Sequence, residues 1–242
     1  MTAHDFFSRH DKVMLQFSAG KDSAACLWLL EDYWDRMDVV WSNPGNPYPE
    51  TLEYMERISK LVPRFKVVLG QQPQDIAKHG WPVDVVPMEG TGIGQEMSGE
   101  AGPKLRPFWE CCWANMWKPM LDEVTRGGYT GIIRGQKLAD SLKGPIRSGT
   151  QVDGIEHFYP VEGWTDEEVI SFLGDRIPPS YTRGLPSSLD CINCTAYSKE
   201  NVGRATDLEK VDLKAWEQVT RVHLHILDSL SNHITAIRKC HG

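Results

Sequence analysis

Six residues near the start of the chain, Ser18-Ala19-Gly20-Lys21-Asp22-Ser23, separate two apolar runs. The run 13–17 predicts a short buried strand, and a helix is expected to begin near Asp22. At such a turn the backbone N–H groups, the hydroxyls and the Lys21 ammonium would converge on an anion. The turn therefore predicts either a phosphate- or sulfate-binding site or an ordinary strand-to-helix connection. The candidate binding residues are Ser18, Gly20, Lys21, Asp22 and Ser23.

This turn differs from the phosphate loop of the P-loop NTPases. That pattern needs a glycine five residues before Gly20 and a serine or threonine directly after Lys21. Leu15 and Asp22 stand at these two positions. The sequence therefore excludes that class of nucleotide-binding site.

Four of the six cysteines are clustered in the sequence. They are Cys111, Cys112, Cys191 and Cys194. Disulfides are not expected in a cytoplasmic chain, so this grouping indicates a metal or redox centre. Adjacent cysteines suit a tetrahedral zinc site poorly, whereas an iron–sulfur cluster accepts them more easily because its ligands bind separate iron atoms. Spacing alone leaves three interpretations: a four-iron cluster, a zinc site and reduced structural thiols.

Composition limits the class of protein. A chain of 242 residues is long enough for one α/β domain with a small appendage. Its formal net charge of −7 argues against broad nucleic-acid binding, although a local basic groove stays compatible with it. No apolar run has the length of a membrane span, and the first residues contain no apolar signal segment. We therefore expect a cytoplasmic protein without membrane contact.

Apolar runs alternate between short and helical lengths along the chain. Strands are expected over 13–17, 38–42, 66–69, 131–134 and 157–160, and helices over 23–36, 49–61, 75–79, 109–126, 166–174 and 213–238. The remainder of 71–106 is expected to be an irregular, mobile loop. This alternation predicts an α/β fold with a mostly parallel twisted sheet and helices on both faces. We divide the chain into a domain over 1–205 and a helical C-terminal extension over 206–242.

Several motifs together resemble one family, the sulfonucleotide (APS/PAPS) reductases, which belong to the PP-loop superfamily with its Rossmann-like fold. The similarity extends over roughly residues 10 to 205. Ser18–Ser23 resembles the family's S-G-G-K-D-S loop, and Cys111-Cys112 through Met120 resembles its C-C-x-x-R-K-x-x-P-L segment. The other matching stretches are Val40 to Gly45 with Pro49-Glu50-Thr51, Gly135 to Ser141, Trp164 to Val169, and Gly184 to Thr195.

The resemblance implies roles for particular residues. The Ser18–Ser23 loop, Gly45 and Lys137 would bind the sulfonucleotide, and Cys111, Cys112, Cys191 and Cys194 would hold a 4Fe-4S cluster. Cys240 would match the family's nucleophilic cysteine, which lies in a C-terminal E-C-G-L-H tail. Here Arg238, Lys239 and His241 flank it, and such basic neighbours favour a thiolate on a flexible tail. Its other interpretation is an unreactive cysteine at a frayed terminus.

The chain also departs from the family pattern. Ala19 replaces a glycine of the loop, and Asn115 with Met116 replaces the family's basic pair. Lys137 replaces an arginine, which removes a bidentate phosphate or sulfate contact. Three nearby cations would compensate for the lost arginine, or else form an ordinary solvated basic loop. They are Arg134, Lys143 and Arg147.

In full, the resemblance implies reduction of adenylyl sulfate or phosphoadenylyl sulfate to sulfite, with AMP or PAP released. The enzyme would work through a thiosulfonate on Cys240 and a thioredoxin-like thiol donor, and a homo-oligomer is compatible with the resemblance. Two other classes stay open. One is a PP-loop enzyme that uses ATP and magnesium to adenylate nucleic acid or transfer sulfur to it. The other is a nucleotide-binding regulator without catalysis.

Overall fold

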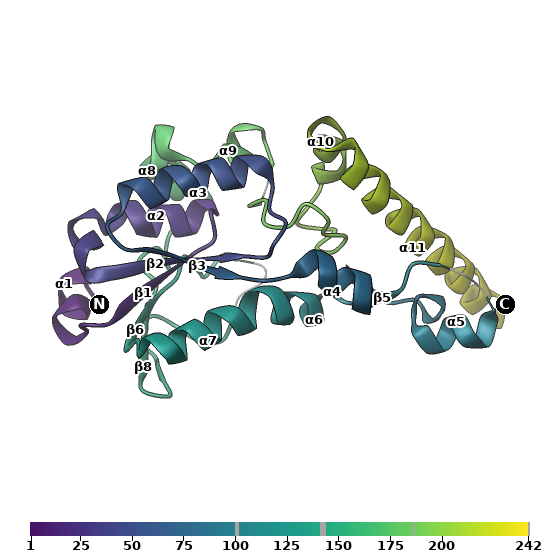
Figure 1. Ribbon diagram of the computed structural model, residues 1–242, viewed down its shortest axis with the longest axis horizontal. Helices are drawn as coiled ribbons and strands as arrows, with labels where there is room; N and C mark the ends of the chain where they lie inside the picture. The colour runs from purple at the N-terminus through teal and green to yellow at the C-terminus, as the bar shows by residue number, and fades with distance from the viewer. Residues whose placement is uncertain (100–101, 141–143, 186, 242) are drawn as a thin grey trace.

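The computed structural model describes residues 1–99, 102–140, 144–185 and 187–241 (Figure 1). Ser141 and Pro186, which belong to the stretches compared above, and the candidate cation Lys143 lie outside these ranges. None of the described helices combines the length and the apolar character that a membrane-spanning helix needs.

A six-stranded sheet with the order β3-β2-β1-β6-β8-β7 forms the centre of the molecule. The strands are β1 Val13–Phe17, β2 Met37–Asn43, β3 Phe65–Leu69, β6 Gly131–Ile133, β7 Gln151–Val152 and β8 Ile155–Phe158. All neighbours pair in parallel except β7 and β8, which are antiparallel. A parallel sheet needs long crossover connections, and helices provide most of them. The predicted α/β fold with a mostly parallel sheet is confirmed.

Helices cover both faces of this sheet (Figure 1). Val13, Leu15 and Phe17 contribute to one apolar core together with the helices on the first face. Met14, the intervening residue, contributes to a second core with Val124. Successive side chains of a strand point to opposite faces, which explains this alternation. The first face carries α1 Ala3–Arg9, α2 Lys21–Leu29, η1 Glu31–Arg36, α3 Pro49–Leu61, α8 Asp166–Leu173, η4 Gly174–Arg176 and α9 Pro179–Thr182.

One long helical stretch covers the second face and changes its geometry part-way. It consists of α6 Phe108–Cys112, the π-helical turn η3 Trp113–Trp117 and α7 Lys118–Gly127. A π-helical turn contains one more residue per turn than an α-helix, and such turns occur frequently at functional sites. In this chain the turn follows Cys112 directly.

The C-terminal helices form a lobe beside the sheet (Figure 1). α10 Arg204–Val211 contains the predicted domain boundary at residue 205, and α11 Leu213–Cys240 follows it. Leu208 and Val219 of these helices pack against Leu185 and Leu189 in one apolar cluster. The extension is thus joined by packing to the loop that precedes Cys191.

Two sequence predictions about local structure were wrong. The helix expected over 75–79 is present as α4 Gln72–His79, but the rest of 71–106 is not an irregular loop: it contains β4 Trp81–Val83, η2 Met88–Gly90, α5 Gly92–Ser98 and β5 Leu105–Pro107. β4 and β5 pair in parallel as a separate small sheet, and strands of three residues are too short to show a clear periodicity. The helix expected over 23–36 divides at Leu30 into α2 and η1.

Candidate functional site

The Ser18–Ser23 turn connects β1 to α2 at the carboxyl end of the sheet. Its hydroxyl groups bond within the turn: Ser23 Oγ lies 2.9 Å from the Gly20 carbonyl oxygen and 3.2 Å from Ser18 Oγ. Ala19, where the family pattern has glycine, adopts a left-handed φ of 58°. This conformation costs an L-residue about 1 kcal/mol, so the alanine places a small strain in the turn.

A second loop, which follows β6, packs directly against this turn. At Gly135 a Cβ atom would lie 2.5 Å from the carbonyl carbon of Asp22 and 2.5 Å from the nitrogen of Ser23. Only glycine fits such a close backbone approach. The contact explains how a loop more than a hundred residues later brings Lys137 to the start of α2.

Lys137 is buried among carboxylates, with 1% of its surface exposed. Its Nζ lies 2.7 Å from Asp22 Oδ1, 2.9 Å from Asp140 Oδ1 and 3.1 Å from Asp166 Oδ1. Burial alone would lower the pKa of Lys137, but the hydrogen bonds to Asp22 and Asp140 outweigh it and raise the pKa. The side chain therefore carries a permanent positive charge inside the protein.

Lys21 completes this charged network. Its Nζ lies 3.0 Å from Asp22 Oδ2 and 2.8 Å from Asp166 Oδ1. The hydrogen bonds from Lys21 and then Lys137 hold the pKa of Asp166 below its usual range, although burial opposes them. Two lysines thus meet three aspartates, and the network has one negative charge in excess.

A cavity of about 650 Å³ opens beside the turn. Ser18, Gly20, Lys21, Asp22 and Ser23 all line it, so the structure brings these predicted residues together. Its other walls include Arg134, Met116, Trp117, Ser187 and Ser188. A site of this volume, lined by both polar and apolar side chains, has the usual character of a small-molecule pocket.

Two predicted binding residues do not line this cavity. Lys137 lies behind the wall and reaches it through the aspartates that it binds. Gly45 lies in the turn after β2 with a φ of +100°, and a Cβ there would lie 2.8 Å from the Gly70 carbonyl oxygen. The glycine is therefore needed by the turn itself, whether or not substrate approaches it.

The structure also reveals residues to which the sequence assigned no binding role. Asp166 and Asp190 both line the cavity. Burial raises the pKa of Asp190 to about 6, although Arg204 and Ser188 act in the opposite direction. Asp166 directly follows Thr165, the residue that caps α8. Its position after β8, where ligands bind in such sheets, is the feature of the sequence that could have indicated a binding role.

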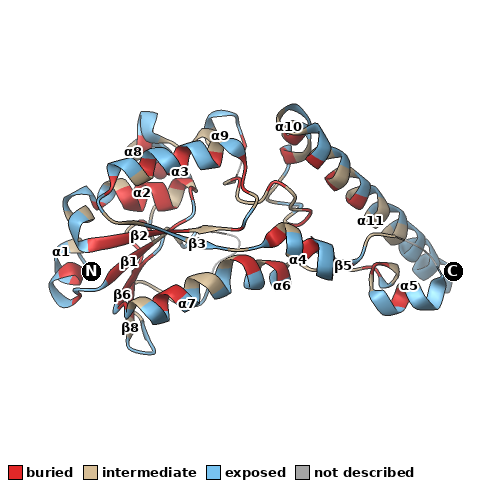
Figure 2. Cartoon of the chain, in the orientation of Figure 1, coloured by how far each residue is buried: buried red, intermediate tan, exposed pale blue. Residues whose placement is uncertain are grey.

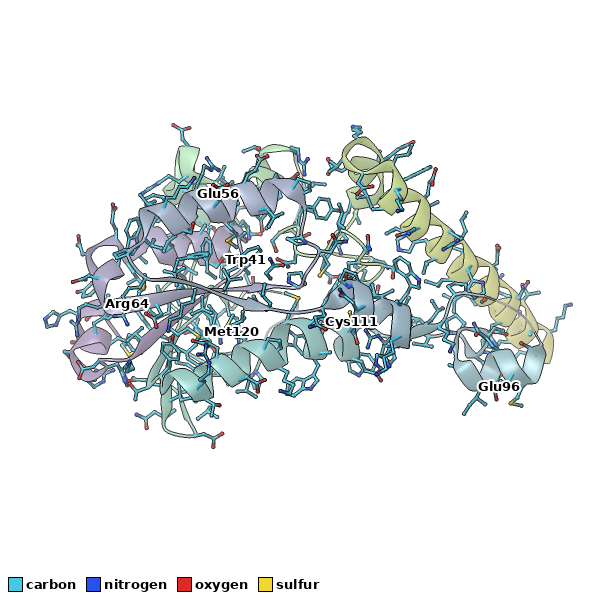
Figure 3. All side chains as sticks on the ribbon, viewed as in Figure 1. Trp41, Glu56, Arg64, Glu96, Cys111 and Met120 are labelled. Carbon is cyan, nitrogen blue, oxygen red and sulfur yellow. The ribbon has the colours of Figure 1, made fainter. Side chains whose placement is uncertain are left out.

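The four clustered cysteines come from two segments. Cys111 and Cys112 end α6, and Cys191 and Cys194 lie in the loop between α9 and α10. Figure 3 shows Cys111 beyond the end of the sheet, toward the C-terminal lobe. Burial raises the pKa of the other three thiols, and the nearby Cys194 raises each of them further. The fold has thus brought together cysteines that are some eighty residues apart in the sequence.

The surroundings of these thiols can be compared with what a metal centre needs. Burial raises the pKa of Cys111 to about 11 and that of Cys112 to about 12. Asn115 Nδ2 lies 3.7 Å from Cys111 Sγ, and the Tyr197 hydroxyl lies 3.5 Å from Cys112 Sγ. Four thiols with N–H and O–H groups close to their sulfur atoms are the chemical types of ligand and hydrogen-bond donor that an iron–sulfur cluster uses. Among the described residues, however, no three potential ligands are close enough together to hold a metal ion.

Cys240 is placed differently from the sequence prediction. It is the last residue of α11 instead of part of a flexible tail, and it is exposed. It does not line the cavity beside the Ser18–Ser23 turn. Figure 2 shows the C-terminal part of α11 exposed on the lobe, away from the sheet.

Known proteins were compared with this chain by sequence and by structure. No family model matches the chain. A curated protein of Gloeobacter violaceus, named phosphoadenosine 5'-phosphosulfate reductase, is 23% identical over 193 residues, which cover 77% of this chain and 73% of the relative. The resemblance to the sulfonucleotide reductases is confirmed.

Solved structures show how far this likeness extends to the fold. The crystal structure of a phosphoadenylyl-sulfate reductase from Candida auris, in complex with phosphate, has a TM-score of 0.50 at 11% identity. The match covers 73% of this chain and 79% of that chain. A U34-tRNA thiolase from Methanococcus maripaludis with a [4Fe-4S] cluster matches with a TM-score of 0.41 and 15% identity, over 90% of this chain and 72% of the other.

The departures from the sulfonucleotide reductase pattern have structural consequences. Asn115, at one position of the missing basic pair, is buried and bonds to Asp75 at 2.7 Å and to the Cys111 carbonyl oxygen at 3.0 Å. Met116, at the other, lines the cavity as an apolar side chain. Of the proposed compensating cations, Arg134 lines the cavity and Arg147 bonds to backbone carbonyls of its own loop. Lys143 lies outside the described residues.

Proposed function

We propose that this protein is an oxidoreductase that reduces adenylyl sulfate or phosphoadenylyl sulfate to sulfite. One observation carries the proposal: the Ser18–Ser23 turn and the segment leading to the cysteines line the same cavity, through Ser187, Ser188 and Asp190. A nucleotide held by the turn would therefore lie next to the clustered thiols. The similarity to a named phosphoadenosine 5'-phosphosulfate reductase supports this assignment.

The proposed chemistry uses two thiols in sequence. The Cys240 thiolate attacks the sulfate sulfur, the bond from sulfur to the bridging phosphate oxygen breaks, and AMP or PAP leaves. The resulting thiosulfonate is attacked at the Cys240 sulfur by a thiol donor of the thioredoxin kind, which forms a disulfide and expels sulfite. A second thiol of the donor then breaks this mixed disulfide and returns Cys240 to the thiol, so the donor dithiol supplies both electrons.

The turn has a defined part in the first step. Negative charge develops on the phosphate as it leaves, and the backbone N–H groups at the start of α2 point at that position in the proposed complex. Lys21 lines the cavity beside them and adds a positive charge. A Cβ added at Gly20 would lie 3.2 Å from Ser18 Oγ, which is a tight contact, so a side chain at this position would crowd the turn.

The proposal requires Cys240 to reach the cavity. In the structure it ends α11, and all residues from 231 to 240 are exposed. A helix end with so little packing unwinds at low cost. The catalytic role of Cys240 therefore predicts a rearrangement of the last turns of α11 when substrate is bound.

We further propose that Cys111, Cys112, Cys191 and Cys194 hold a 4Fe-4S cluster. The influence of Cys194 on the other three thiols and the polar groups of Asn115 and Tyr197 beside Cys111 and Cys112 support this assignment. When bound, the cluster would tune the electrostatics near the sulfate group and would not need to pass electrons. Arg204, which is buried and bonds to the Cys191 carbonyl oxygen, would hold the second ligand pair in place.

Sulfite and AMP release test the proposed activity. The purified protein is mixed with adenylyl sulfate or phosphoadenylyl sulfate and a dithiol. Lys21→Met should lower kcat/KM by at least about tenfold, since it removes a charged contact to the phosphate. Lys12→Met, which removes an equal charge at the opposite end of β1, should leave kcat/KM unchanged. Equal rates in the two variants would contradict the role of the turn.

One observation favours a second candidate function. Cys240 lies outside the cavity, whereas an ATP-dependent PP-loop enzyme would not need it. Such an enzyme would bind ATP with magnesium at the same turn and transfer an adenylyl group to an acceptor such as a nucleic acid. Pyrophosphate release from ATP and magnesium that is undiminished in Cys240→Ser would favour this class over the reductase.

A further inference from the structure

A single oxygen atom of Asp166 contacts both lysines of the charged network. Asp166 Oδ1 lies 2.8 Å from Lys21 Nζ and 3.1 Å from Lys137 Nζ. Two ammonium groups that share one oxygen form the arrangement that also suits an oxygen of phosphate or sulfate. The place between the lysines is therefore an anion position, and a side chain of the protein already fills it.

Asp166 is held less firmly than the other two aspartates. Its side chain is 59% exposed, compared with 22% for Asp22 and 28% for Asp140. Asp140 is also fixed by the backbone, because the Lys137 N–H donates to its Oδ2 at 2.8 Å. Asp166 lies at the first position of α8, whose end is capped by Thr165 and Glu168. Its carboxylate can thus leave the lysines without disturbing the helix.

We propose that Asp166 is a specificity-determining residue that competes with the substrate for Lys21 and Lys137. In the free protein its carboxylate occupies the anion position, and on binding a phosphate or sulfate group of the nucleotide displaces it toward solvent. Weakly held anions do not overcome this competition. A nucleotide does, because its base and ribose contribute further contacts along the cavity. The inference rests on the proposed function for the identity of the nucleotide.

The direction in which anion affinity changes when Asp166 is replaced distinguishes competition from a positioning role. Removal of the competing charge strengthens anion binding, whereas a residue that merely positions the lysines would weaken it on removal. Asp166→Asn keeps the size of the side chain, and Asp166→Ser provides a second variant that retains a helix-capping residue type. Glu167→Gln is the matched control, since it removes an equal charge from the exposed neighbour on the same helix.

The experiment is a calorimetric titration of the full chain with AMP, adenosine and inorganic sulfate. We expect Asp166→Asn and Asp166→Ser to bind AMP and sulfate about tenfold more tightly than the unmodified protein. Adenosine, which lacks a phosphate, should bind all variants equally, and Glu167→Gln should match the unmodified protein throughout. Unchanged or weaker binding of AMP and sulfate by the Asp166 variants would overturn the inference.

The titrations also separate this inference from the proposed function. Sulfate binding requires only the two lysines, so its tightening in Asp166→Asn supports the competition whether or not the protein is a reductase. Failure of the unmodified protein to release sulfite, combined with that tightening, would reject the reductase and retain the inference. Sulfite release by the unmodified protein, combined with unchanged sulfate binding in Asp166→Asn, would retain the reductase and reject the inference.

Discussion

Lys137 Nζ lies 2.7 Å from Asp22 Oδ1, although the two residues are 115 positions apart in the sequence. This ion pair links the loop after β6 to the first turn of α2, and through Asp166 it reaches α8 as well. Three connections at the carboxyl end of the sheet are thus joined by one buried ammonium group. The place agrees with the general position of ligand sites in open α/β sheets.

Loss of Lys137 should therefore destabilise the protein as well as weaken nucleotide binding. Lys137→Met leaves the carboxylates of Asp22 and Asp140 without their buried partner. We expect the free energy of unfolding to fall by about 2 kcal/mol. Chemical denaturation measures this change, and a variant as stable as the unmodified protein would show that the network contributes little to the fold.

The contact at Gly135 gives a steric prediction. Gly135→Ala would place a Cβ 2.5 Å from backbone atoms of Asp22 and Ser23. Because backbone cannot yield as a flexible side chain does, we expect loss of AMP binding by at least about tenfold together with a lower melting temperature. Gly163→Ala is the control, since a Cβ there meets no atom within 4 Å. Similar behaviour of the two variants would contradict the close approach.

The sequence predicted the turn and the sheet because both depend on local patterns. The run 13–17 is apolar and is followed by small residues, and the strand and the helix start lie within one residue of the prediction. Asp166 and Asp190 could not be assigned in this way. Their positions beside the cavity depend on loops that are distant in the sequence lying close together in the fold. The periodicity of apolar residues within one segment does not indicate which loops are neighbours.

The C-terminal cysteine shows a different limit of sequence reasoning. Apolar residues continue at helical spacing up to Ile237, so the pattern already contained a helix almost to the end. The prediction of a flexible tail came from the family resemblance instead. Similarly, the short strands β4 and β5 depend on pairing with each other and leave little local signal.

A buried carboxylate on the second face makes stability depend on pH. Asp38 Oδ2 lies 2.5 Å from the Tyr129 hydroxyl and 2.7 Å from Lys66 Nζ, and Asp38 Oδ1 lies 2.7 Å from Arg64 Nε. Burial would raise the pKa of Asp38, but these partners outweigh it and hold the pKa below 3.8. The stabilisation is therefore fully present above pH 3.8 and is lost as the pH falls through the lower, folded-state pKa.

Asp38→Asn tests this dependence. At neutral pH we expect the variant to be less stable by about 2 kcal/mol, because it loses a charged partner for Lys66 and Arg64. Its stability should fall less steeply below pH 4 than that of the unmodified protein. Thermal melts across pH 3 to 7 measure both effects, and parallel curves for the two proteins would contradict the assignment.

The proposed cluster predicts the metal content of single variants. Anaerobically purified protein should contain four iron atoms per chain, and Cys194→Ser should lose most of them. Cys240→Ser, which changes an exposed cysteine outside the group, should retain the iron. Metal analysis and the visible absorption spectrum report the result. Stoichiometric zinc in a colourless protein would reject the iron–sulfur assignment.

The central claim is tested most directly by the intact mass of the anaerobic protein after mixing with adenylyl sulfate or phosphoadenylyl sulfate in the absence of a thiol donor. We expect a mass increase of one sulfonate group, located on Cys240, absent from Cys240→Ser and removed by a dithiol with release of sulfite. A protein that binds the nucleotide and acquires no sulfonate with either compound would contradict it.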